Sequence, residues 1–161
     1  MTNKVYVACF MGQGGYSFSW GMWGQIAPAL RRIGCTVDVY RYVDGQDARK
    51  RLNWFGNNGY RTATVGYSLG TSTVTWMQTL QKMNLACCIA MSEFEVTYRI
   101  NHDNAKRAVL WHGSEWDRLS SAGEDLGFDR IIEIPSFPVL GHLVMPTVVW
   151  NQIVDEVRRL Q

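Results

Sequence analysis

One short segment has the residue types of a reactive serine on a tight turn. Residues 66–70 have the sequence Gly-Tyr-Ser-Leu-Gly, a Gly-x-Ser-x-Gly pattern between an apolar run at 61–67 and a helix-like stretch. The two glycines relieve crowding in a sharp strand-to-helix turn, which lifts the serine hydroxyl clear of a sheet. The helix N-terminus that follows favours developing negative charge. The segment predicts a nucleophile at Ser68, while the pentapeptide alone also fits a plain turn with a capping serine.

Two later segments hold an acid and a base for such a serine. Residues 109–117 have the sequence Val-Leu-Trp-His-Gly-Ser-Glu-Trp-Asp, so the carboxylate of Asp117 lies beyond an apolar run. Residues 138–142 have the sequence Pro-Val-Leu-Gly-His, and His142 precedes the last helical stretch. Imidazoles titrate near neutrality, which suits general-base catalysis. Alone, Asp117 also fits a helix cap and His142 a loop histidine; together the order Ser…Asp…His is that of a hydrolase triad.

The elements that must position these residues follow from hydrophobic periodicity, because short apolar runs alternate with amphipathic stretches. Strands are predicted at 4–10, 36–42, 61–67, 85–91, 106–111 and 130–134. Helices are predicted at 17–33, 46–55, 71–83, 117–126 and from Pro146 onwards. Continuously apolar strands joined by helices predict an α/β fold, with three α/β/α layers around a mostly parallel sheet of about six strands. Ligands bind such sheets beyond the carboxyl ends of the strands, where the three candidate residues fall.

Length and composition exclude several classes of protein. The 161 residues suit one domain, so we expect a single domain over 1–161. With 47% apolar and 19% charged residues, most of the chain is not disordered. A net charge of +2 is too balanced for nucleic-acid binding. No apolar run approaches the ~18 residues of a membrane span, and the first run is too short for a signal-peptide core.

The cysteines indicate neither a metal site nor a disulfide framework. The chain has no Cys-x-x-Cys pair and no Cys/His pair at zinc-ligand spacing. Buried free thiols in a reducing compartment fit better, so we expect a cytoplasmic protein without metal or cofactor. No feature of the sequence predicts the oligomeric state. The four cysteines are Cys9, Cys35, Cys87 and Cys88.

Three segments resemble motifs of the α/β-hydrolase superfamily: Val-Gly-Tyr-Ser-Leu-Gly at 65–70, Trp-His-Gly-Ser-Glu-Trp-Asp at 111–117 and Leu-Gly-His-Leu-Val at 140–144. The resemblance covers nearly the whole chain and is to a small member without a cap domain. It implies a serine hydrolase that cleaves carboxylic esters, or thioesters or amides, of a small-molecule acyl substrate.

By this resemblance Ser68 attacks, His142 removes its proton and Asp117 orients the imidazole. Two backbone N–H groups would stabilise the oxyanion, one just after the serine and one in the loop after the first strand. That loop lacks the His-Gly pair usual in the family. The candidate donors are Leu69 for the first position, and Met11 and then Gly12 for the second.

The acid and the base have competitors. Family members often carry the acid three residues after the glycine of a His-Gly pair, where this chain has a tryptophan. Asp117 lies one residue later, Glu115 one residue earlier is the alternative acid, and Glu93 is a third choice. His102 fits a surface position, and His112 fits a role in shaping its own loop.

Aromatic residues near the first and third strands are candidates for an apolar substrate pocket. Tyr16, Trp20 and Tyr67 are the main candidates. Phe18 and Trp23 fit core packing under the first helix at least as well.

Two rival functions remain. Residues 12–17, Gly-Gln-Gly-Gly-Tyr-Ser, resemble a degenerate Gly-x-Gly-x-x-Gly nucleotide-binding loop, with Asp38 or Asp44 as the ribose ligand. That interpretation leaves the serine, acid and histidine unexplained. A non-catalytic interaction protein on the same fold is the other rival, because fold does not fix function.

Overall fold

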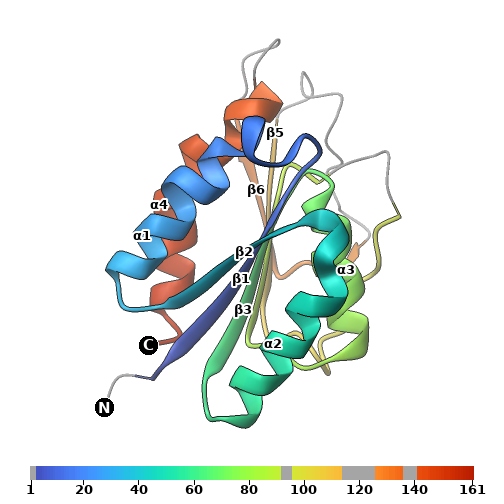
Figure 1. Cartoon of the computed structure of the whole chain (residues 1–161). Coiled ribbons are helices and arrows are strands. Elements are labelled where there is room, and N and C mark those ends of the chain that lie inside the picture. The colour runs from blue at the N-terminus through green and yellow to red at the C-terminus, as the bar shows by residue number, and fades with distance from the viewer. Residues whose placement is uncertain (1–2, 92–95, 114–125, 136–140) are drawn as a thin grey trace.

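The computed structural model describes residues 3–91, 96–113, 126–135 and 141–161 (Figure 1). The strands are β1 (Val5–Met11), β2 (Thr36–Arg41), β3 (Arg61–Tyr67), β4 (Leu85–Ile89), β5 (Ala108–Gly113) and β6 (Arg130–Ile134). The α-helices are α1 (Ala27–Arg32), α2 (Gly45–Asn57), α3 (Gly70–Leu80) and α4 (Gly141–Arg158). Shorter turns are the 3₁₀ segments η1 (Gly15–Ser17) and η3 (Tyr42–Asp44) and the π-helical η2 (Gly21–Ile26).

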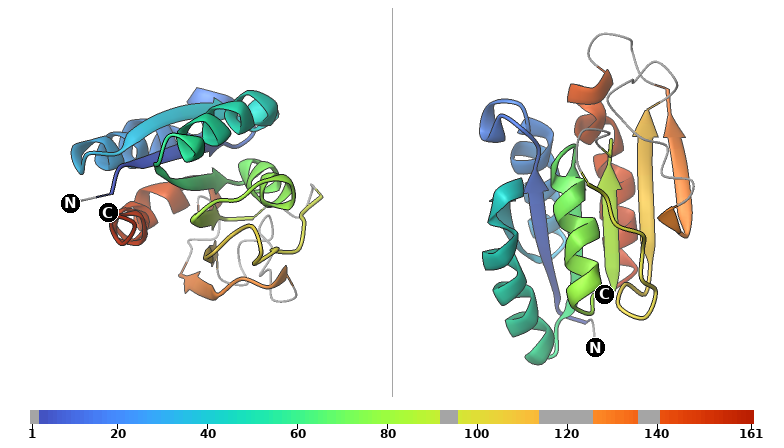
Figure 2. Two further views of the ribbon diagram at one scale, coloured as in Figure 1. Left: turned by 90° about the horizontal axis from the view of Figure 1, so that it is seen from below. Right: turned by 90° about the vertical axis from the view of Figure 1, so that its right-hand side faces the viewer.

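The strands form one six-stranded sheet in the order β2-β1-β3-β4-β5-β6, and each neighbouring pair is parallel. Helices α1 and α4 cover one face, and α2 and α3 cover the other (Figure 2). The predicted α/β/α arrangement of three layers is therefore confirmed. The strand order reverses between β1 and β3, and in open parallel sheets ligands bind at the carboxyl ends of the strands at such a reversal.

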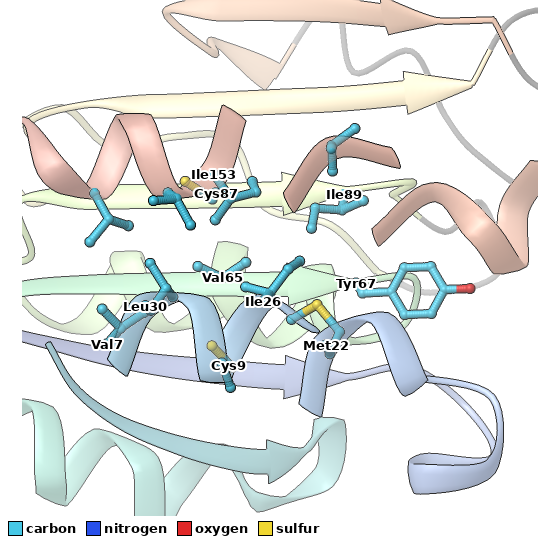
Figure 3. Packing of buried hydrophobic residues seen from close by; sticks show 14 of the residues in the cluster. Val7, Cys9, Met22, Ile26, Leu30, Val65, Tyr67, Cys87, Ile89 and Ile153 are labelled. Atoms are coloured by element: carbon cyan, nitrogen blue, oxygen red, sulfur yellow. The ribbon is translucent and has the colours of Figure 1, made fainter. Parts of the chain in front are cut away.

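Both faces of the four central strands β1, β3, β4 and β5 are buried, which explains why these strands are continuously apolar. Val7 and Cys9 of β1 share one buried cluster with Leu30 of α1, while Ile153 of α4 lies beside Cys87 of β4 in the same cluster (Figure 3). The alternate residues of β1, such as Phe10, pack under α2 and α3. All four cysteines are buried free thiols, as predicted, and burial raises the pKa of the Cys9 thiol to about 12.

The first helix differs from its prediction. Regular helix was expected over 17–33, but the chain first turns through η1 and then forms the π-helical η2 before α1. Gly14 and Gly15 have positive φ, which begins the turn. The helical stretch also packs tightly on α4, because a Cβ on Gly21 would lie 2.6 Å from Cβ of Pro146. The spacing of apolar residues does not reveal such positive φ angles or close backbone contacts, so the sequence pattern could not predict them.

The prediction that Pro146 opens the last helix is wrong, since α4 begins at Gly141 and Pro146 lies inside it. A proline inside a helix cannot donate to the carbonyl four residues earlier, which here belongs to His142. The hydroxyl of Tyr67 donates to that carbonyl oxygen instead, at 2.9 Å. The helix can therefore extend through the proline to its true start.

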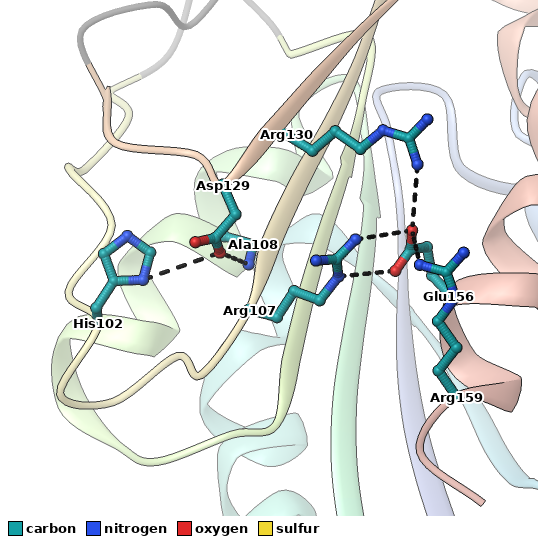
Figure 4. Close-up of polar contacts among 7 residues, drawn as sticks. All are labelled: His102, Arg107, Ala108, Asp129, Arg130, Glu156 and Arg159. Atoms are coloured by element: carbon teal, nitrogen blue, oxygen red, sulfur yellow. Dashed lines mark hydrogen bonds and ion pairs between the residues drawn. The ribbon is translucent and has the colours of Figure 1, made fainter.

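The far end of α4 is fastened to the sheet by a buried carboxylate (Figure 4). Glu156 is only 4% exposed and accepts two hydrogen bonds from Arg107, at 2.8 and 3.0 Å. Arg159 lies 3.1 Å and Arg130 3.8 Å from the same carboxylate. The bond to Glu156 raises the pKa of Arg107 above its usual value.

Replacing Arg107 with methionine is expected to lower the free energy of unfolding by about 2 kcal/mol, because a charge-assisted pair to a buried carboxylate is lost. The exposed pair Arg158–Asp155 supplies the control, and Arg158→Met is expected to change stability by less than about 0.5 kcal/mol. Urea unfolding of both variants measures the difference. Equal midpoints for the two variants would contradict this account of the Glu156 cluster.

None of the helices in the described part of the chain combines the length and the apolar character that crossing a membrane requires.

Candidate active site

Ser68 lies at the turn between β3 and α3, and its backbone is in the left-handed region with φ of 52°. This conformation costs a non-glycine residue on the order of 1–2 kcal/mol and persists only where neighbours hold it. The Ser68 N–H donates to the Ile89 carbonyl at 3.0 Å, and the Thr71 N–H and hydroxyl both donate to the Ser68 carbonyl. The turn therefore holds the serine at the carboxyl edge of the sheet.

The two glycines of the motif let neighbouring backbone segments pack closely against the turn. A Cβ on Gly66 would lie 2.5 Å from the Gly70 carbonyl oxygen. A Cβ on Gly70 would lie against the Phe10 carbonyl, closer than the 3.0 Å limit that real Cβ contacts respect. Glycine at both positions lets the start of α3 rest on β3 and β1.

Gly70→Ala is expected to destabilise the protein by about 3 kcal/mol, because the added methyl meets backbone that cannot move aside. Gly56→Ala is the matched control, since its Cβ would have nothing closer than 3.8 Å and the position is helical. That change is expected to be neutral or stabilising by up to about 1 kcal/mol. The free energy of unfolding of both variants is measured from their denaturant midpoints, provided that the slope of the transition is unchanged. A Gly70→Ala protein as stable as the parent would contradict this explanation of the motif.

His142 lies in the first turn of α4 rather than in the loop before it. It reaches Ser68 from the face of the sheet that α1 and α4 cover, whereas α3 covers the opposite face. Its Nε2 is 2.9 Å from Ser68 Oγ, and its side chain is half-buried. The Tyr67 hydroxyl holds the His142 backbone through the carbonyl that Pro146 leaves without a helical donor. The two rings also pack, with centroids 5.6 Å apart. A hydroxyl and an imidazole are thus in hydrogen-bond contact across 74 residues of chain.

The three candidate acids, Asp117, Glu115 and Glu93, lie outside the described residues. The two other histidines make contacts elsewhere. His102 contacts the Gly127 carbonyl at 2.9 Å and lies 3.9 Å from Asp129 (Figure 4), while His112 lies within β5.

The loop after β1 lies directly against the serine. A Cβ on Gly12 would be 2.9 Å from Cβ of Ser68, so this position needs a glycine for close approach. The Gly12 N–H donates to the buried Ser19 hydroxyl at 3.1 Å, whereas Met11 is the last residue of β1. On the other side, Leu69 is the N-cap of α3, and none of the hydrogen bonds in the described part of the chain uses its N–H. Backbone from both predicted donor segments therefore flanks Ser68.

The candidate pocket aromatics separate into two groups. Tyr16 and Trp20 are more than half exposed and flank the half-buried Trp23, whose Nε1 donates to the Tyr16 carbonyl. Tyr67 is buried and contacts His142. The alternative that Phe18 packs in the core under the first helix is wrong, because this residue is 57% exposed. The regular helix that would have turned it inward begins only after it.

The carboxylates proposed as ribose ligands are engaged by arginines. Asp38 accepts from the Tyr6 hydroxyl at 3.0 Å and lies 3.4 Å from Arg51. Asp44 pairs with Arg41 at 2.9 Å, and this pairing lowers the pKa of Asp44. Across residues 3–91, 96–113, 126–135 and 141–161, no group of three or more His, Cys, Asp or Glu side chains is arranged to hold a metal ion.

No protein-family model and no curated protein matches the sequence. Two solved structures are similar across almost the whole chain. A candidate hydrolase of the α/β superfamily from Xanthomonas campestris pv. campestris aligns with a TM-score of 0.64 at 11% identity, over 97% of this chain and 99% of that one. YbtT, the type II thioesterase of the yersiniabactin NRPS/PKS biosynthetic pathway, solved as a serine-to-alanine mutant, aligns with a TM-score of 0.63 at 11% identity, over 98% and 94%. The chain has an α/β-hydrolase-like fold.

Proposed function

We propose that the protein is a serine hydrolase that cleaves carboxylic esters or thioesters of small-molecule acyl groups. The observation that carries the proposal is the 2.9 Å contact between His142 Nε2 and Ser68 Oγ, made by a serine held at φ of 52°. Strained backbone at a nucleophile is typical of this class of turn. The structural likeness to a type II thioesterase supports including thioesters among the substrates.

The proposed reaction proceeds through an acyl-enzyme. Ser68 Oγ attacks the carbonyl carbon while His142 Nε2 takes the hydroxyl proton. The tetrahedral intermediate then expels the alcohol or thiol, which receives that proton from His142. A water molecule, deprotonated by His142, then attacks the acyl-enzyme carbonyl. The carboxylic acid product leaves, and Ser68 regains its proton from His142. Asp117 is the proposed acid that orients the imidazole, and Glu115 is the alternative.

Two backbone N–H groups are proposed to stabilise the oxyanion. The Leu69 amide is the first, because it lies at the N-terminus of α3 directly after the nucleophile. Met11 is preferred over Gly12 as the second, because the Gly12 N–H already donates to Ser19. Each such donor typically contributes about 3 kcal/mol of transition-state stabilisation.

Turnover of activated acyl substrates tests this function. The protein is incubated with 4-nitrophenyl esters and with acyl thioesters of several acyl groups, and product release is followed against the Ser68→Ala protein. We expect serine-dependent hydrolysis of esters, thioesters or both. Absence of turnover across the panel by folded protein would contradict the proposal and favour the non-catalytic interaction protein.

Tyr67→Phe is expected to lower kcat about tenfold while KM stays within about twofold, because His142 loses the hydroxyl that fixes its backbone and small misplacements are costly in rate. A merely structural hydroxyl would affect stability by about 1 kcal/mol and leave kcat unchanged. Steady-state kinetics and thermal unfolding separate the two. Unchanged kcat in the variant would contradict this positioning role.

A further inference from the structure

One buried side chain holds the loop after β1 in place beside the nucleophile. Ser19 lies between η1 and η2, is only 1% exposed, and its Oγ accepts a hydrogen bond from the Gly12 N–H at 3.1 Å. Gly12 is the first residue after β1, and its Cβ would lie only 2.9 Å from Cβ of Ser68. A single hydrogen bond therefore links Ser19 to the residue that lies against the nucleophile.

The backbone of Ser19 is itself fixed by the short helical segments on either side. Its N–H donates to the Gly15 carbonyl at 3.0 Å, which ties it to the start of η1. Its carbonyl oxygen accepts from the Met22 N–H at 2.9 Å, which ties it to η2. The Gly15 N–H donates in turn to the Gly12 carbonyl at 3.3 Å. Gly12 is thus held on both sides, by the Ser19 side chain and by the Gly15 backbone.

The loop depends on this anchor because its own backbone is unusually free. Three of its first four residues are glycine, and Gly14 and Gly15 have positive φ. Glycine loses more conformational freedom on folding than any other residue, so ordering this loop is costly. Within the described part of the chain, the Ser19 hydroxyl makes the only hydrogen bond between a side chain and the backbone of residues 12–15.

The position of this loop bears on the proposed chemistry because the loop supplies the second oxyanion donor. Met11, the preferred donor, is bonded directly to Gly12, so a displacement of one displaces the other. Such donors stabilise an oxyanion most when they are fixed in place before the reaction. A misplacement of about 1 Å at a reacting centre costs on the order of 100-fold in rate.

We propose that Ser19 is a positioning residue for the oxyanion site of the enzyme. Its hydroxyl oxygen holds Gly12 at a fixed distance from Ser68, and through Gly12 it holds the second oxyanion donor. This inference rests on the proposed function. Ser19 is buried and acts through Gly12, so its effect falls on the transition state, in which negative charge develops on the substrate oxygen, and not on substrate binding.

Steady-state kinetics of Ser19→Ala test this role, with the ester or thioester that the parent protein hydrolyses fastest. We expect kcat to fall about tenfold while KM stays within about twofold, because the loop loses its anchor but the substrate keeps its ground-state contacts. Ser17→Ala, at an exposed serine of η1, is the matched control and is expected to keep the parent kcat. A hydroxyl that serves the fold alone would lower the unfolding temperature and leave kcat of the folded protein unchanged.

A trifluoromethyl ketone with the acyl group of that substrate gives a second readout. Ser68 Oγ adds to its carbonyl carbon, the hydroxyl proton passes to His142, and the carbonyl oxygen becomes an anion that resembles the tetrahedral intermediate. The inhibition constant is therefore expected to rise about tenfold in Ser19→Ala, in step with the fall in kcat/KM. A purely structural role would leave this constant unchanged in folded protein.

Amide hydrogen exchange checks the hydrogen bond itself, independently of activity. The Gly12 amide is expected to exchange at least about tenfold faster in Ser19→Ala than in the parent. The amide of Leu52, a buried residue within α2, is the internal control and is expected to exchange equally in both proteins.

The outcomes separate the positioning role from the proposed function. The role is overturned, and the function stands, if an active parent is matched by Ser19→Ala in kcat, if the variant loses activity through KM alone, or if Ser17→Ala loses as much. Unchanged exchange at Gly12 also overturns the role. Folded parent protein that hydrolyses no ester or thioester overturns both.

Discussion

Ser68→Ala is expected to lower kcat by about 10⁶-fold on any ester that the protein hydrolyses, because the nucleophile is removed and only binding and oxyanion stabilisation remain. The side chain accounts for this loss, since the turn itself is held by backbone hydrogen bonds from Ser68 and Thr71 and by the close approach of Gly66 and Gly70. Nitrophenol release at saturating substrate measures the effect. Circular dichroism confirms that the variant is folded.

Ser68→Gly separates catalysis from folding at the same position. Glycine takes a positive φ without strain, so this variant is expected to be more stable than the parent by about 1 kcal/mol and equally inactive. Ser17→Ala, at an exposed serine of η1, is the control that should retain activity. Residual turnover above about one per cent in either Ser68 variant would contradict a nucleophilic role.

His142→Ala is expected to reduce kcat by about as much as Ser68→Ala, because a serine hydroxyl is a weak nucleophile until a base removes its proton. The two side chains act as one unit, so the double variant should lose little more than either single variant. His102→Ala, at a histidine bound to the Gly127 carbonyl, is the control with unchanged activity. A double variant whose losses multiply would show that Ser68 and His142 act independently and would contradict the 2.9 Å contact as a catalytic pair.

Much of the fold could be predicted because its four central strands are buried on both faces. All six predicted strands start within two residues of the observed strands, and β3 and β6 match at both ends. Strand β4 starts as predicted but ends two residues earlier, at Ile89, where the following residue, Ala90, has φ of 50°. Apolar runs between helical stretches indicate directly where the strands lie. The parallel orientation of the strands follows from the helices that connect them.

The parts that could not be predicted depend on contacts between distant residues. Proline is a usual first residue of a helix, but here the Tyr67 hydroxyl, supplied by β3, satisfies the carbonyl that Pro146 leaves without a donor, and α4 begins five residues earlier. The buried Glu156 looks like any helix-surface glutamate until Arg107 is placed beside it. Ser72 Oγ makes no hydrogen bond within the described part of the chain, and the Ser68 carbonyl behind it accepts from Thr71 instead.

The site combines local and non-local information. The motif at 66–70 predicted a turn whose glycines allow close packing, and the structure has both the turn and the packing. The pairing of Ser68 with His142 depends on the order of the strands, which no short segment encodes. Phe18 shows the limit of periodicity, because one irregular turn before η2 leaves an apolar side chain exposed.

The most direct test of a nucleophilic Ser68 is labelling with a fluorophosphonate, read by intact mass and peptide mapping. The proposed function predicts one adduct per chain, located on Ser68, absent from Ser68→Ala and formed far more slowly by His142→Ala. Folded protein that acquires no adduct, or acquires it on a different serine, would contradict the claim that Ser68 and His142 form a catalytic pair.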